Sequence, residues 1–220
     1  MRSVIFDLDG TLADTSADLI AAANACFAEM GSAERLDPVA DAATAFGGGR
    51  AMLRLGLERM GQPDEAVVDA YYPTLLAVYE QEIDRRTTLY PGAMEAIATL
   101  KADGFAVAIC TNKPEGLARL LMTRLGVLSE FGALIGADTL PVRKPDPTPF
   151  REAVARAGGD PGRGLLVGDT VTDRDTARAA GAPVVLVTFG PTGQAMADLA
   201  PDGLLSDYGE LPDLAARLLG

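Results

Sequence analysis

The stretch SVIFDLDGTL, residues 3–12, decides how the rest of the chain is interpreted. Its first four residues form a short apolar run, which predicts a buried β-strand. The run breaks into Asp7, Leu8, Asp9 and Gly10, and the glycine lets the chain turn away without a steric penalty. Carboxylates at a strand end suit a nucleophile, a metal ligand, or both. Because Asp-rich turns are also common in proteins, the choice between these interpretations depends on the remaining sequence.

The composition describes an acidic globular protein. Of the 220 residues, 48% are hydrophobic and 23% are charged, and the net charge is −12. A strongly acidic chain repels phosphates, so we expect no nucleic acid or anionic membrane as partner. An anionic substrate would need a bound cation. No apolar stretch reaches the roughly 18 residues of a membrane span, and the first apolar run is too short for a signal peptide, so we expect a cytoplasmic protein.

Missing residue types exclude several kinds of hydrolase. The chain has no His, which excludes a Ser-His-Asp triad, a His phosphatase and a His-ligated zinc site. Cys26 and Cys110 lie in apolar surroundings, and neither is followed by the arginine that a Cys-x5-Arg phosphatase loop requires. Any hydrolysis would therefore rest on carboxylates, hydroxyls and a hard metal ion.

Apolar periodicity divides the chain into two kinds of segment. Residues 15–86 contain helical patterns and no clear strand, whereas strands and helices alternate in the second half. Continuous apolar strands between helices predict a parallel sheet covered on both faces. The predicted fold class is α/β, with a core of residues 1–14 and 87–220 and an all-helical insertion. The predicted helices span 18–30, 51–60, 64–83, 93–103, 115–125, 148–157, 173–180 and 212–219, and the predicted strands span 3–6, 105–110, 133–135, 164–167 and 184–187.

Polar residues also follow later predicted strands. Thr111 and Asn112 come directly after one strand, and Asp169 follows another, with Asp173 four residues further on. Ligands of open α/β sheets bind beyond the carboxyl ends of the strands, which makes these side chains candidates. Lys144, one of only three lysines, stands in a proline-rich loop. Each segment taken singly is also compatible with an ordinary turn, a surface lysine or a helix N-cap.

In order, these segments resemble the four motifs of the haloacid dehalogenase superfamily, whose members are mostly aspartate-dependent phosphatases. The resemblance covers essentially the whole chain. It implies a Rossmann-like core with a helical cap placed between the first and second motifs. The segments that carry it are DLDGT at residues 7–11, TN at 111–112, RKPDP at 143–147 and GDTVTD at 168–173.

The resemblance also implies roles for individual residues. Asp7 would attack phosphorus and form an aspartyl-phosphate, and Asp9 would protonate the leaving group and then activate water. Thr111, Asn112 and Lys144 would bind the phosphate of the substrate.

The cofactor implied by the resemblance is Mg²⁺. The carboxylates of Asp7 and Asp169 and the carbonyl of Asp9 would be its protein ligands, and Asp173 would hold a metal-bound water. These are oxygen ligands, which Mg²⁺ prefers. The partner implied is a small phosphorylated metabolite, and the protein would be a monomer or a homodimer.

Within the superfamily, the first and third motifs look most like those of phosphoglycolate phosphatases. Dehalogenases usually lack the acid at the position of Asp9, and phosphonate-cleaving members use a cap lysine that residues 15–86 do not contain. Three alternatives stay open: a sugar phosphomutase, a phosphatase for another small metabolite such as a sugar phosphate, and a non-catalytic binding protein that has kept the fold.

The cap contains one candidate for substrate recognition. Three glycines, including Gly48 and Gly49, precede Arg50 at the start of a predicted helix. Amide groups at such a position bind anions, and the arginine can form a bidentate contact with a carboxylate. Because phosphoglycolate carries a carboxylate, we expect Gly48, Gly49 and Arg50 to contact it. The alternative is a flexible turn between two cap helices.

Overall fold

The structure is a computed structural model that describes all residues from 1 to 220. The chain forms two compact units, one made of residues 1–13 and 89–220 and the other of residues 14–88. It passes between them at β2 (Ala13–Asp14) and β3 (Thr88–Leu89), which pair as a two-stranded sheet. None of the helices combines the length and the apolar character that crossing a membrane requires.

The first unit is built on a six-stranded parallel sheet, as the continuous apolar strands predicted. β1 lies at its centre between β4 and β6, so that Phe6 pairs with Ile109 on one side and Val167 on the other. Every residue of these three strands is buried, which explains their lack of polar–apolar alternation. In spatial order the strands are β5 (Ala133–Ile135), β4 (Ala106–Cys110), β1 (Ser3–Phe6), β6 (Gly164–Gly168), β7 (Val184–Val187) and β8 (Gly203–Leu205).

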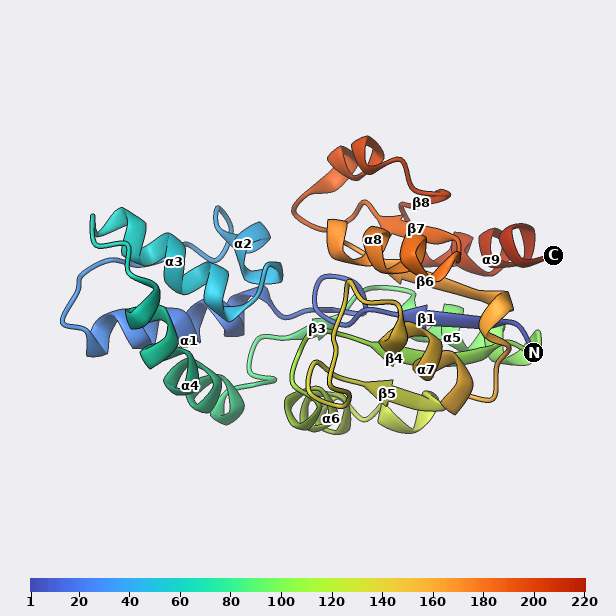
Figure 1. The fold of residues 1–220 in the computed structure, drawn as a ribbon, viewed down its shortest axis with the longest axis horizontal. Helices are drawn as coiled ribbons and strands as arrows, with labels where there is room; N and C mark the ends of the chain where they lie inside the picture. Colours follow the sequence, from blue (N-terminus) through green and yellow to red (C-terminus); the bar gives the residue numbers. More distant parts are fainter. The chain divides into compact units, whose positions relative to one another are not determined.

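Helices cover both faces of this sheet (Figure 1). On one face α7 (Thr148–Arg156) and α8 (Val171–Ala180) pack against β1, β4, β5, β6 and β7, and on the other α5 (Ala93–Ala102) and α9 (Leu211–Leu219) pack against β4 and β6. Under α7 and α8, Ile5, Ala108 and Leu166 form the middle of a fully buried cluster. The remaining elements of this unit are α6 (Glu115–Arg124) and the short 3-10 helices η1 (Leu128–Glu130), η2 (Pro161–Arg163), η3 (Gly193–Leu199) and η4 (Tyr208–Glu210).

Apart from its two end residues, which belong to β2 and β3, the second unit has helices as its only regular secondary structure. This confirms the predicted helical character of the insertion. They are α1 (Ser16–Glu29), α2 (Ala42–Phe46), α3 (Gly49–Arg59) and α4 (Glu65–Gln81). Gly56 lies in the middle of α3 although glycine destabilises helix interiors. A Cβ at this position would lie 2.1 Å from Cζ of Phe27, so close packing against α1 requires the glycine.

Several short elements were not predicted from the sequence, among them β8, α2, β2 and β3. The strand β8 has only three residues and one of them, Leu204, is exposed, so no continuous apolar run marks it. Pairing with the edge of β7, through Val185 and Gly203, forms this strand. Elements of two to five residues depend on such tertiary partners because they cannot hold their conformation alone.

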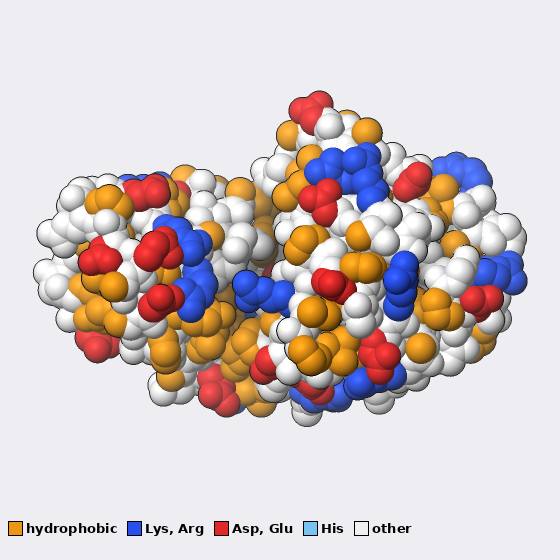
Figure 2. Space-filling view, viewed as in Figure 1, with side chains coloured by type: hydrophobic (Ala, Val, Ile, Leu, Met, Phe, Trp, Pro, Cys, Tyr) orange, Lys and Arg blue, Asp and Glu red, His pale blue; other side chains and the backbone are white.

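On the face drawn in Figure 2, basic side chains lie among acidic ones and form no continuous basic surface. Many basic side chains of the protein are in ion pairs, such as Arg54 with Glu65 on the helical unit and Arg156 with Glu152 on α7. Exposed pairs of this kind contribute little to stability, because solvent and salt screen the attraction. They do reduce the attraction that arginines would otherwise exert on an anion.

Candidate active site

The candidate site lies at the carboxyl ends of the three central strands. Asp7 follows β1, Thr111 follows β4 and Asp169 follows β6. The backbone continues the sheet pairing at these positions, since the amide of Asp7 donates to Val167 O at 2.9 Å and that of Thr111 to Ile135 O at 2.9 Å. The order β4-β1-β6 thus brings residues more than 100 positions apart to one edge.

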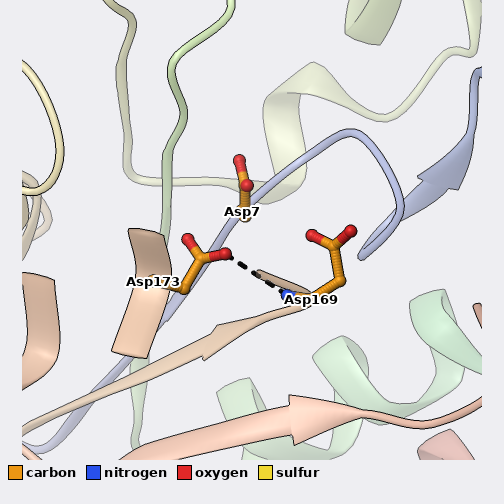
Figure 3. A group of neighbouring side chains, drawn as sticks. All are labelled: Asp7, Asp169 and Asp173. Carbon is orange, nitrogen blue, oxygen red and sulfur yellow. Dashed lines mark hydrogen bonds between the residues drawn. The ribbon is translucent and has the colours of Figure 1, made fainter. Parts of the chain in front are cut away.

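Three carboxylates meet there. One oxygen each of Asp7, Asp169 and Asp173 can be chosen so that all three lie within 4.8 Å of one another, and the side chains converge on one small region (Figure 3). Oxygens in such an arrangement fit a hard divalent cation such as Mg²⁺. The first two side chains retain a little exposure, whereas Asp173 is completely buried.

The helix α8 holds Asp173 in place. The sequence predicted that Asp173 opens this helix, but the helix begins at Val171 and Asp173 is its third residue, in a capping box with Thr170. The hydroxyl and the amide of Thr170 donate to Oδ2 of Asp173 at 2.7 and 3.1 Å. Gly168 makes this approach possible, because a Cβ there would lie 2.3 Å from the Asp173 carboxyl carbon.

Lys144 is the cation of this cluster. Its Nζ lies 3.1 Å from Oδ2 of Asp7 and 2.6 Å from Oδ1 of Asp173, and the side chain is almost fully buried. Burial alone would lower the pKa of Lys144, but the charges of Asp173 and Asp7 outweigh burial and raise that pKa. The lysine is therefore an ammonium ion at any physiological pH, and both oxygens of Asp173 are already engaged.

Burial and mutual repulsion disfavour the ionised carboxylates. Burial raises the pKa of Asp7 to about 6, with Asp173 and Asp9 adding to the rise and Lys144 opposing it. The pKa of Asp169 is also raised, first by burial and then by the charges of Asp173 and Asp7. With all three carboxylates ionised, one ammonium leaves two negative charges uncompensated. A divalent cation would supply the missing charge, so the residues present fit Mg²⁺.

The second acid of the first motif has a different partner. Lys113 Nζ lies 2.8 and 3.0 Å from the two carboxylate oxygens of Asp9. Both residues belong to the core unit, and the lysine side chain is only 3% exposed. No sequence pattern predicted Lys113 as a site residue, although it directly follows Thr111 and Asn112 and lysine is rare in this chain.

The rest of the first motif is held by contacts from distant segments. The Thr11 hydroxyl donates to Oδ1 of Asp169 at 3.1 Å, and the phenol of Tyr208 donates to the Thr11 carbonyl at 2.7 Å. Burial raises the pKa of Tyr208, so its phenol stays a donor. Gly10 adopts φ 78°, the left-handed turn that glycine permits. Neither Thr11 nor Tyr208 was predicted as a site residue, and Tyr208 has no local signal in the sequence.

The structure places Thr111 and Asn112 beside this cluster. Thr111 is buried, and its hydroxyl accepts a hydrogen bond from the Lys113 amide at 3.2 Å. The Asn112 side-chain amide donates to the backbone carbonyl of Lys144 at 3.0 Å. Asn112 thus ties the loop that carries Lys144 to the end of β4.

The predicted recognition residues of the cap lie in the helical unit. Gly48 precedes α3 with φ 90°, and its amide donates to Ala45 O at 2.9 Å, so this amide is already used. Gly49 and Arg50 are the first two residues of α3. The guanidinium of Arg50 pairs with Asp69 and lies 4.5 Å from the centre of the Tyr72 ring.

Known proteins resemble this chain in sequence and in fold. A model of the haloacid dehalogenase-like hydrolases matches residues 1–181. The phosphoglycolate phosphatase of Mesorhizobium japonicum is 40% identical over 98% of this chain and 96% of its own length. That of Cereibacter sphaeroides strain ATCC 17029 is 39% identical over the full length of both proteins. A crystal structure from Haemophilus somnus, described as a predicted phosphoglycolate phosphatase, shares the fold, with a TM-score of 0.82, 24% identity and 97% of each chain covered.

Proposed function

This chain belongs to the haloacid dehalogenase-like hydrolases and is a phosphatase, and we propose that it hydrolyses small organic phosphomonoesters with Mg²⁺, with 2-phosphoglycolate as its substrate. The observation that carries the proposal is the arrangement around Asp7. A carboxylate that follows the central strand contacts a buried ammonium, lies within a three-carboxylate cluster, and is two residues from Asp9. The names of the relatives support the choice of substrate.

The proposed reaction has two displacements at phosphorus. An oxygen of Asp7 attacks the phosphorus, the bond to the substrate alcohol breaks, and an aspartyl-phosphate forms. Water then attacks the phosphorus, which releases inorganic phosphate and restores the carboxylate. Lys144, which lies against Asp7, and the Thr111 hydroxyl would offset the charge on the phosphoryl oxygens in both steps.

Asp9 supplies the proton transfers. It donates a proton to the departing alcohol in the first displacement and accepts one from water in the second. Its position two residues after Asp7 places it on the same loop as the attacking carboxylate. A binding protein would not need this second acid, which favours catalysis over a purely binding role.

Mg²⁺ would be held by the carboxylates of Asp7 and Asp169 and by the carbonyl of Asp9. When bound, it offsets the negative charge of the cluster and of the phosphate. The two oxygens of Asp173 are engaged by Lys144 and Thr170. Asp173 would therefore orient Lys144 beside the metal ligands without binding the metal directly.

The experiment that tests the proposed function is a phosphate-release assay with the purified protein and Mg²⁺. The panel should contain 2-phosphoglycolate, several sugar phosphates and p-nitrophenyl phosphate. We expect phosphate release, with the highest kcat/KM for 2-phosphoglycolate. Transfer of phosphate between positions of a hexose phosphate, without its release, would indicate a mutase instead. A higher kcat/KM for a sugar phosphate would replace 2-phosphoglycolate as the proposed substrate. The proposed reaction, hydrolysis of a phosphomonoester, would stay the same.

Mg²⁺ binding should become tighter as the pH rises through about 6. Below its pKa of about 6 Asp7 holds a proton that the metal must displace, and Asp169 adds to the effect because its pKa is also raised. The affinity should rise by up to about tenfold per pH unit for each proton released. Calorimetry at pH 5, 6 and 7, in buffers of different ionisation enthalpy, measures the affinity for Mg²⁺ and the number of protons released on binding.

Asp169→Asn should strongly weaken the binding of Mg²⁺ in the same titration. The control is Asp175→Asn, which changes an exposed carboxylate on α8 and should leave Mg²⁺ binding unchanged. Ca²⁺ should bind but inhibit, because it takes more ligands at longer distances and would misplace Asp7. An affinity that does not change between pH 5 and 7, or full activity with Ca²⁺ alone, would contradict this assignment of the ligands.

Arg50→Ala should lower kcat/KM for 2-phosphoglycolate by about 10- to 100-fold, the usual loss for a hydrogen bond to a charged group. The reason is that Arg50 would bind the remote carboxylate of the substrate, and remote binding energy is used in the transition state. Hydrolysis of p-nitrophenyl phosphate, which has no carboxylate, should change little.

Arg54→Ala is the matched control, since Arg54 also lies on α3 and pairs with an exposed acid. This substitution should leave kcat/KM unchanged for both 2-phosphoglycolate and p-nitrophenyl phosphate. If Arg50→Ala reduces the hydrolysis of both substrates equally, Arg50 has a structural role and the carboxylate of the substrate is bound elsewhere.

A further inference from the structure

The core site contains two buried lysines, and each is paired with a different carboxylate of the first motif. Lys144 contacts Asp7 and Asp173, whereas Lys113 contacts both oxygens of Asp9. The third lysine of the chain, Lys101, forms an exposed pair with Glu130. Burying an ammonium is costly unless a charged partner compensates it, so the placement of Lys113 requires an explanation.

The backbone around Lys113 is fixed on both sides. Its amide donates to the Thr111 hydroxyl at 3.2 Å, and its carbonyl accepts from the amide of Ala137 at 3.0 Å. The loop after β4 therefore holds the Cα of Lys113 in place while the side chain reaches Asp9, 104 residues earlier. Because Nζ contacts both carboxylate oxygens, at 2.8 and 3.0 Å, it restricts the orientation of the carboxylate as well as its position.

A general acid needs this restriction. Asp9 lies in a loop rather than in a strand, and its side chain is 18% exposed. Proton transfer requires its oxygen within about 2.6–3.2 Å of the leaving oxygen, and a carboxylate that rotates freely meets this condition only part of the time. We propose that Lys113 is a positioning residue that acts through Asp9, and this inference rests on the acid–base role that the proposed function gives Asp9.

A competing role is direct binding of the substrate phosphate by Lys113. In the structure the ammonium is directed at both oxygens of Asp9, and Lys144 is the lysine that contacts Asp7, where phosphorus would be attacked. The two roles make different kinetic predictions. A positioning residue affects proton transfer to a poor leaving group, whereas a phosphate-binding residue affects every phosphomonoester.

The test replaces Lys113 with methionine, which keeps the length of the apolar stem. We expect kcat/KM for 2-phosphoglycolate to fall by about 10- to 100-fold, part of the loss expected for removing the acid itself. For p-nitrophenyl phosphate, whose leaving group needs no proton, the change should stay within about threefold. Lys101→Met, the same substitution in an exposed ion pair, should leave both values unchanged.

A double-mutant cycle with Asp9→Asn then shows whether Lys113 acts through Asp9. The double variant Asp9→Asn with Lys113→Met should be no slower than Asp9→Asn alone on 2-phosphoglycolate. Losses that multiply, or a KM that rises equally for both substrates in both backgrounds, would overturn the inference in favour of direct phosphate binding or a structural role. If the wild type and Lys101→Met release no phosphate from either substrate, the proposed function itself fails, and the inference fails with it.

Discussion

Asp7→Asn should abolish turnover, with phosphate release falling by roughly 10⁴-fold or more, as for other catalytic nucleophiles. An amide is a poor nucleophile, and being neutral it is also a weaker ligand for a divalent cation. The variant should still fold, because Lys144 keeps its contact with Asp173 at 2.6 Å. The measurement is phosphate release from 2-phosphoglycolate and p-nitrophenyl phosphate, since both need the nucleophile. Wild-type rates in a folded Asp7→Asn protein would exclude the aspartyl-phosphate mechanism.

The same substitution should stabilise the protein in the absence of metal. The pKa of Asp7 is about 6 in the folded protein and 3.8 is the ordinary value of the unfolded chain. Between these values the folded state binds more protons, so the carboxyl costs stability above about pH 6 and costs none below about pH 4. The gain for Asp7→Asn should therefore be on the order of 1–3 kcal/mol at pH 7, and it should disappear near pH 4. Melting curves at both pH values measure it.

Asp9→Asn should slow the hydrolysis of 2-phosphoglycolate by roughly 10²–10⁴-fold, the usual range for removing a general acid–base group. Asparagine has nearly the same size, and its carbonyl oxygen can still accept a hydrogen bond from Lys113, so the loop should keep its conformation. The loss should be smaller for p-nitrophenyl phosphate because its leaving group departs without a proton.

A series of aryl phosphates with leaving groups of graded pKa measures this dependence. The rate of Asp9→Asn should fall more steeply with the pKa of the leaving group than the rate of the wild type. Parallel dependences for the two enzymes would remove Asp9 from the role of acid. In that case the only role of the ion pair between Asp9 and Lys113 would be to hold the loop after β1 in place.

Stability and function make opposite demands on this site. Asp7 and Asp169 have raised pKa values because they are buried beside Asp173, so their ionised forms destabilise the metal-free fold. A bound divalent cation would reverse this balance, because it would bind the ionised carboxylates. An electrostatic cost of this kind is typical of sites that are arranged to bind a ligand rather than to stabilise the ligand-free protein.

The sequence alone determined the α/β class, the helical insertion and the strand-end positions of the acids. Each depends on local patterns: a buried parallel strand reads as an uninterrupted apolar run, and the residues after Phe6, Cys110 and Gly168 change abruptly to polar ones. Such signals are visible because the conformation of a strand, a turn or a helix start depends mostly on neighbouring residues.

Only the tertiary structure decided which side chains are partners. The contact of Lys113 with Asp9 and that of Tyr208 with Thr11 join residues 104 and 197 positions apart. The order of the strands, which places β1 between β4 and β6, decides which loops meet, and no local pattern encodes it. Residue spacing likewise indicated a helix beginning at Asp173, whereas the hydrogen bonds of Thr170 set its start at Val171. Long-range pairing therefore assembled a site whose individual acids were already visible in the sequence.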